Sequence, residues 1–110
     1  MTPGIHVATA TTVTASALSA GTSVALAGLA GRQPWLTFHR LVKGALTNVA
    51  LHVGGVELRL ETATGEFDSF IVGAAGAAIE VVHTGAGADG GYSITCGYVA
   101  AIAGPTLSGR

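Results

Sequence analysis

The stretch WLTFHRLVKGALTNVALHVGGVELRLE, residues 35–61, decides the fold that we expect for this chain. Its last part, VELRLE at 56–61, alternates apolar and charged residues without a break. Because side chains along a strand point to opposite faces with a period of two, this alternation predicts a half-buried antiparallel strand. We therefore expect Val56, Leu58 and Leu60 to form its dry face, with the charged side chains between them on the other face.

A glycine pair, Gly54-Gly55, separates this strand from a second strand-like run, NVALHV at 48–53. Two glycines between strands are a strong hairpin signal, because both can adopt positive φ. The stretch thus predicts one strand over 35–42 followed by a tight hairpin over 48–62.

Working outward, further strand-like runs occupy residues 5–13, 22–30, 66–72, 79–83 and 92–102, with glycine-rich turns between them. Residues 14–21 fit either one helical turn or an approach to a turn. About eight short strands without a helix predict an all-β fold, a single-domain antiparallel β-sandwich of jelly-roll-like form, whose strand order the sequence does not reveal. The domain spans residues 1–110, with loose ends expected at 1–4 and 105–110.

The chain carries unusually little charge. Asp, Glu, Lys and Arg make up 10% of residues, against about 25% in a typical domain, and mean hydropathy is +0.58. One explanation is a surface of Thr, Ser, Ala and Gly, which is polar enough to stay soluble without charge. We favour the other, that much of the surface is covered by other subunits, because low charge and small residues suit close packing between them. With net charge −1 and scattered basic residues, the sequence predicts neither a nucleic-acid nor a membrane partner.

The expected strand at 35–42 is apolar on both faces. One face holds Leu36, Phe38, Arg40 and Val42, and the other holds Trp35, Thr37, His39 and Leu41. Two-sided apolar character indicates a sheet covered by its own core and by a neighbour. We therefore predict a subunit interface that includes Trp35, Leu36, Phe38 and Leu41, although a lone tryptophan is as often a core residue.

Groups that could support chemistry are few. The four histidines are His6, His39, His52 and His83, and none forms a pair at i, i+2 or i, i+4 spacing. For metal ligation or pH sensing they could still meet across strands, or a single histidine could form a ring at a symmetry axis, with His39 or His52 as first choice. Glu57 and Glu61, with Arg59 between them, fit a same-face set of ion pairs better than a pair of glycosidase carboxylates.

The remaining motifs are interpreted structurally. Cys96 is alone, so no internal disulfide can form, and its strand-like surroundings predict a small buried side chain. The runs GAAGAA at 73–78 and GAGADGG at 85–91 lack the Lys of a P-loop and the repeats of a calcium-binding array, so both predict turns. The sequence predicts a protein that is not an enzyme, with no catalytic residues, no cofactor and no metal site.

The Thr, Ala and Gly-rich first part, the many short strands and the ending ITCGYVAAI at 94–102 resemble bacteriophage head-decoration, fibre or other accessory virion proteins with a β-sandwich or jelly-roll fold. The resemblance implies binding to a capsid or tail lattice, often as a trimer, and location in the virion after assembly in the host cytoplasm. The expected function is a structural subunit of a symmetric assembly, a homo-oligomer with a larger protein lattice as its partner.

Two other functions are compatible with the sequence. The first is a carbohydrate-binding or adhesin-like sandwich that presents loops such as residues 84–91. The second is a small jelly-roll enzyme of the cupin type with His and Glu ligands, but the clustered His pair and nearby Glu of such a site are missing.

Overall fold

The computed structural model describes residues 10–100, so the expected loose ends, His6 and most of the expected strand at 5–13 lie outside it. Within this range the chain forms eight strands and no helix. The strands are β1 (Thr11–Leu18), β2 (Gly21–Leu26), β3 (Arg32–Val42), β4 (Asn48–Val53), β5 (Val56–Glu61), β6 (Gly65–Val72), β7 (Ile79–Thr84) and β8 (Gly90–Ala100). The ambiguous residues 14–21 complete β1 and its turn into β2, which ends at Leu26, four residues before the end expected from the sequence.

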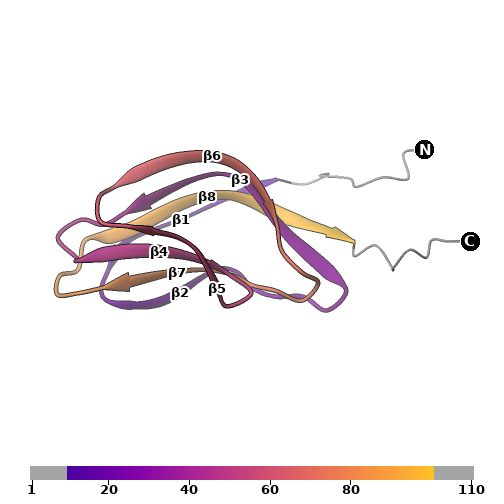
Figure 1. The fold of residues 1–110 in the computed structure, drawn as a ribbon, viewed down its shortest axis with the longest axis horizontal. Coiled ribbons are helices and arrows are strands. Elements are labelled where there is room, and N and C mark those ends of the chain that lie inside the picture. The colour runs from indigo at the N-terminus through magenta and orange to yellow at the C-terminus, as the bar shows by residue number, and fades with distance from the viewer. Residues whose placement is uncertain (1–9, 101–110) are drawn as a thin grey trace, which may run out of the picture.

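The strands form two antiparallel four-stranded sheets that lie face to face, as Figure 1 shows. Their orders are β1-β8-β3-β6 and β2-β7-β4-β5. The chain forms a long two-stranded ribbon that turns at the Gly54-Gly55 hairpin, where both glycines have positive φ. From this hairpin outward, β4 pairs with β5, β3 with β6, β2 with β7 and β1 with β8. This nested pairing, rolled into two sheets, is a jelly roll. The predicted all-β sandwich is confirmed.

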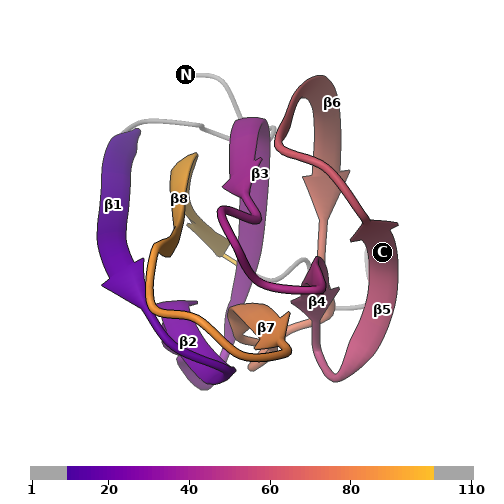
Figure 2. The same cartoon turned by 90° about the vertical axis from the view of Figure 1, so that its left-hand side faces the viewer.

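The sandwich has two open flanks. Figure 2, an end-on view, shows β1 and β2 along one flank and β5 and β6 along the other. The core between the sheets consists of Ala25, Leu36, Leu41, Val49, Leu51, Val53, Ile79, Val81, Tyr92, Ile94 and Cys96. Burial of these largely aliphatic side chains supplies the main driving force for folding, at about 25 cal/mol for each Å² removed from water.

A β-bulge at Thr37 changes the faces that were expected for β3. Opposite β8, Thr37 is the extra residue, because Leu36 pairs with Cys96 and Phe38 with Thr95. The register with β6 shifts at the same place, but there the extra residue lies on β6. Leu36 and His39 therefore both face the core, whereas Phe38 faces outward. The two-sided apolar pattern of residues 35–42 thus arises in part because the strand reverses its faces midway.

The expected dry face of β5 is wrong. Val56, Leu58 and Leu60 are 44 to 59% exposed. Leu60 lies opposite Ala50, whose neighbours Val49 and Leu51 belong to the core, so Leu60 points to the outer side of the sheet. The alternation of residues 56–61 is real, but Leu58 and Leu60 look toward solvent, and Val56, although opposite the core residue Val53, stays exposed at the edge.

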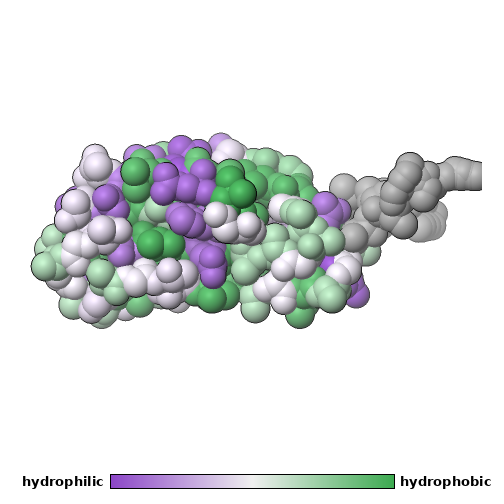
Figure 3. Space-filling model, turned by 60° about the horizontal axis from the view of Figure 1, so that its bottom comes forward, coloured by the Kyte–Doolittle hydropathy of each residue, from purple (hydrophilic) through white to green (hydrophobic). Residues whose placement is uncertain are grey.

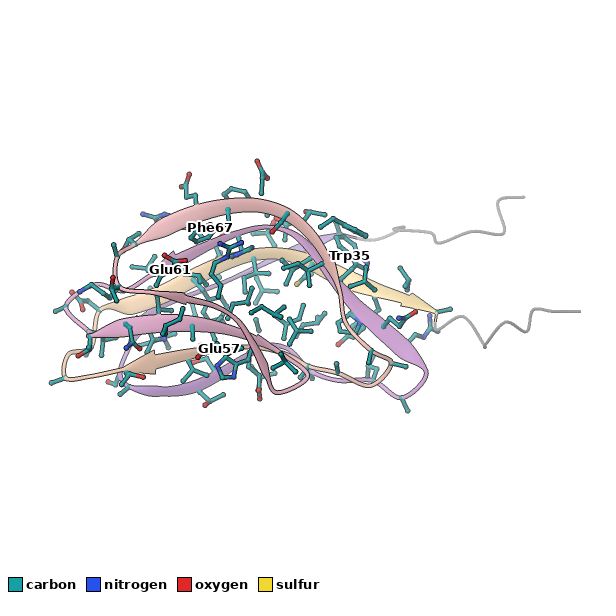
Figure 4. All side chains as sticks on the ribbon, viewed as in Figure 1. Trp35, Glu57, Glu61 and Phe67 are labelled. Carbon is teal, nitrogen blue, oxygen red and sulfur yellow. The ribbon has the colours of Figure 1, made fainter. Side chains whose placement is uncertain are left out.

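The charged side chains of β5 are split between the two sides. A register shift between Leu51 and His52 places Glu57 beside His52 and leaves Arg59 opposite the core residue Leu51. Glu61, opposite Val49, faces the same way as Arg59. Figure 4 shows Glu61 directed into the space between the sheets and Glu57 directed away from it. The expected same-face set of three charges is therefore replaced by one outward and two inward side chains.

Candidate functional site

The four residues predicted as an interface occupy different environments. Leu36 and Leu41 are fully buried in the core, where they support the fold rather than a contact with a second chain. Trp35 is 1% exposed and packs beside Phe70, with ring centroids 6.3 Å apart. Phe38 keeps part of its surface exposed on the outer side of β3. The surface that a neighbour could reach is therefore at Phe38 and around Trp35.

Exposed apolar side chains gather on one flank of the sandwich. Among residues 10–100 seven large apolar side chains are exposed, and five of them belong to the edge strands β5 and β6. These five, Val56, Leu58, Leu60, Phe70 and Val72, are called the β5–β6 flank below. The sequence contained the signal, namely the strict alternation of β5, but the direction of that alternation could not be read from it.

Polar pairs lie among these apolar groups. Arg40 and Glu66 are 3.4 Å apart between β3 and β6, and His52 and Glu57 are 3.6 Å apart between β4 and β5. Exposed pairs of this kind contribute about 0 to 1 kcal/mol to stability. Figure 3 shows the resulting mosaic of hydrophobic and hydrophilic residues toward the β2-β7-β4-β5 side. Such a surface combines apolar contact area with charges that can select a partner and its orientation.

A partly buried stack with His39 at its inner end lies just inside the same flank. The Arg59 guanidinium carbon sits 3.9 Å from the centroid of the Phe67 ring, and Phe67 stacks on His39 with centroids 5.1 Å apart. Arg59 Nη1 is also 4.0 Å from a carboxylate oxygen of Glu61. Figure 4 shows Phe67 and Glu61 on facing strands of the two sheets. Arg59 therefore joins the sheets across their open side.

His39 is the most perturbed titratable group. It has no exposed surface, and neither ring nitrogen has a hydrogen-bond partner. Burial, and secondarily the positive charge of Arg59, lower the pKa of His39 from 6.5 to about 4. The imidazole is consequently neutral at pH 7 and resists protonation while the sandwich is closed.

Among the described residues, His52, His83 and Cys96 do not converge with His39. His83 Nε2 lies 3.0 Å from the Val42 carbonyl oxygen, and His52 faces outward beside Glu57. Among the described residues, no three His, Cys, Asp or Glu side chains lie close enough together to hold a metal ion. Cys96 is fully buried, and burial raises the pKa of its thiol.

The loop between β7 and β8, which the adhesin alternative would use, is tied to the fold. Asp89 Oδ1 accepts a hydrogen bond of 2.7 Å from the Ala45 backbone N–H, and the Thr47 N–H donates to the Thr84 carbonyl at 2.7 Å. On the facing turn, Lys43 Nζ donates to two backbone carbonyl oxygens, those of Gly44 and Leu46. These hydrogen bonds stabilise the two turns.

Comparison of the chain with known protein families, with curated proteins and with solved structures found no match. Residues 10–100 contain no helix long and apolar enough to cross a membrane.

Proposed function

We propose that this chain is a structural subunit of a symmetric assembly and that it contacts its neighbours through the β5–β6 flank. The observation that carries the proposal is the placement of five of the seven exposed large apolar side chains on these two edge strands. Edge strands also present unpaired backbone N–H and C=O groups, which makes them natural sites for contact with another chain. The opposite flank, β1 and β2, contributes only Val24 to the exposed apolar set.

The size of the apolar flank favours a multivalent assembly over an isolated tight pair. Full burial of one Val, Leu or Phe side chain contributes about 1.5 to 3 kcal/mol, so covering five half-exposed ones contributes roughly 5 kcal/mol per subunit. Association costs about 4 to 15 kcal/mol in lost freedom and ordering. The free energy of forming one such contact is therefore close to zero. Several contacts per subunit, in a ring or lattice, give a stable complex.

The specific assembly that we propose is a virion, with the chain as a decoration or accessory protein bound to a capsid or tail lattice. The jelly roll is used by viral capsid domains, and also by lectins and cupins, so the fold is compatible with this role without requiring it. Support comes from the charge content of 10% and from the apolar flank. A cyclic trimer would set the flank against a different surface of the neighbour, whereas a twofold dimer would set it against itself.

The proposal is tested by measuring mass in solution with light scattering over a wide concentration range. We expect the natural chain to exceed monomer mass and to dissociate on dilution. The double substitution Leu58→Thr with Leu60→Thr should give a monomer with an unchanged circular dichroism spectrum. The matched control is Val24→Thr, which removes an equally exposed apolar side chain from the other flank and should leave the mass unchanged.

Two results would contradict the proposal. One is a natural chain that stays monomeric at every concentration, and the other is equal dissociation by Val24→Thr and by the flank variant. A stable monomer whose melting temperature rises with a glycan would instead favour the carbohydrate-binding alternative.

A further inference from the structure

Strand β5 is attached weakly to the rest of the sandwich. It is the last strand of its sheet and pairs only with β4 among the described strands. Its apolar side chains are about half exposed, and none belongs to the core cluster, so they add little to the core. What β5 directs toward the opposing sheet is Arg59, whose guanidinium lies over the Phe67 ring of β6. A single cation–π contact between sheets therefore helps to keep this side of the sandwich closed.

His39 stacks on the same Phe67 ring. The two rings lie at 29° with centroids 5.1 Å apart, and His39 comes from β3, the neighbour of β6. Its two nitrogen atoms expose essentially no surface and have no partner in the described structure. Leaving such a group unpaired is costly even when it is neutral, and a charged imidazolium there costs much more.

The groups around His39 offer no compensation for a positive charge. From β5 it faces the Arg59 cation, while Glu61 is 4.0 Å from that guanidinium. From β6 come Phe67 and the hydroxyl of Ser69, which is itself buried without a partner. The inward groups of β1, β4 and β8 include Val13, Ala15, Val49, Leu51, Tyr92, Ile94 and Cys96, and those of β2 and β7 include Ala25, Ile79, Val81 and the buried His83. Burial raises the pKa of the Tyr92 hydroxyl and of the Cys96 thiol, so both are neutral in acid.

We propose that the His39–Phe67–Arg59 stack is an acid-sensitive latch, and that a proton on His39 releases β5 from the opposing sheet. An imidazolium can be hydrated only when β5 moves away, because the ring nitrogens are closed off from water in the latched form. That movement breaks the contact of Arg59 with Phe67 and uncovers the inner side of β4. Acid thus changes the strand that carries most of the β5–β6 flank.

The size of the effect follows from proton linkage. The pKa of His39 is about 4 in the closed form, against an ordinary value of 6.5 for a hydrated imidazole. Acidification can therefore raise the opening equilibrium of β5 by up to about 300-fold, the ratio of the two acid dissociation constants. The change begins below pH 6.5 and is complete below pH 4. The latch is a property of one subunit and does not depend on the proposed self-association.

The test is amide hydrogen exchange at several pH values, corrected for the intrinsic pH dependence of exchange. It is run on the natural chain and on the Leu60→Thr variant at low concentration, which separates opening from dissociation. Between pH 7 and pH 4, protection of the β5 amides should fall by about 100-fold. The β2–β7 pairs, on the opposite flank, should change much less. His39→Phe keeps a flat ring but cannot take a proton, so it should remove the pH response, whereas the control His52→Gln should retain it.

Three outcomes would overturn the latch. One is equal loss of protection in β2 and β5, and a second is an unchanged acid response in His39→Phe. The third comes from titration of the natural chain by NMR and does not depend on any variant. If the His39 ring titrates near 6.5 in the folded protein, the imidazole is not held neutral and the latch does not exist.

Discussion

Replacing Leu60 with threonine should cost little stability, although Leu60 lies in the most regular apolar alternation of the chain. It is 51% exposed, and its cross-strand neighbour is Ala50 on the outer side of the sheet. Full burial of a leucine contributes about 1.5 to 3 kcal/mol, so a half-buried one contributes about 1 kcal/mol. Threonine also suits a strand, which limits the loss further. The matched substitution is Leu51→Ala on the adjacent strand β4, where Leu51 is a core residue with no exposed surface. It should lower the free energy of unfolding by about 2 to 5 kcal/mol.

The measurement is urea unfolding followed by the fluorescence of Trp35. This is the only tryptophan of the chain, and at 1% exposure its emission should shift to longer wavelength when the protein unfolds. Each protein is measured at two concentrations, because association through the flank would make the apparent stability depend on concentration. The free energies are compared at the concentration where the species is monomeric.

The reasoning would be refuted if Leu60→Thr destabilised the monomer by as much as Leu51→Ala. Such a result would mean that Leu60 faces the core and that the register of β5 on β4 is shifted by one residue. A one-residue slip would turn every β5 side chain to the other face. The comparison therefore tests directly whether Leu60 faces solvent or the core.

Three further outcomes are expected. Cys96 is fully buried and the pKa of its thiol is raised, so it should react with a thiol reagent only as fast as the protein opens. Reaction near the rate of a free thiol would contradict the buried position of Cys96. Gly90→Ala should destabilise the folded protein by more than about 1 kcal/mol, because the Cβ of the new alanine would lie 2.5 Å from the His83 ring. An unchanged melting temperature would contradict that packing. Between pH 7 and pH 4 the free energy of unfolding of the natural chain should fall by about 3 kcal/mol more than that of His39→Phe. The reason is that His39 takes up a proton below pH 6.5 in the unfolded chain but only near pH 4 in the folded protein. Equal losses in the two proteins would show that other groups cause the acid sensitivity.

Much of the fold could be predicted from local pattern. The hairpin over β4 and β5 was expected from Gly54-Gly55, and both glycines do take positive φ. The strands β3, β4, β6 and β7 begin and end within three residues of their expected limits. The first described strand continues to Leu18, past the expected end at residue 13, because Thr-rich sequence favours extended structure but contains no marker for where pairing ends.

The candidate site was less accessible to sequence reasoning. The prediction selected Trp35 and its neighbours on β3 because they are apolar on both faces, but the bulge at Thr37 accounts for part of that pattern. The stack was missed, since His39, Arg59 and Phe67 are separated in sequence and meet only across the two sheets. A bulge in β3 and a register shift in β5 depend on which strand pairs with which, and pairing between distant strands leaves little trace in local sequence.

Strand periodicity and glycine turns are local properties of the backbone and its side chains, so a small all-β sandwich could be predicted from the amino-acid sequence. The order of the strands and the face that each strand presents follow from pairing between distant segments, which the fold alone reveals. The alternation of Val56–Glu61 is compatible with either orientation, and the pairing of Arg59 with Leu51 selects the one that turns the leucines to solvent. A charged side chain that can stack on an aromatic ring across the sandwich can face inward, and its strand then presents its apolar side to another molecule.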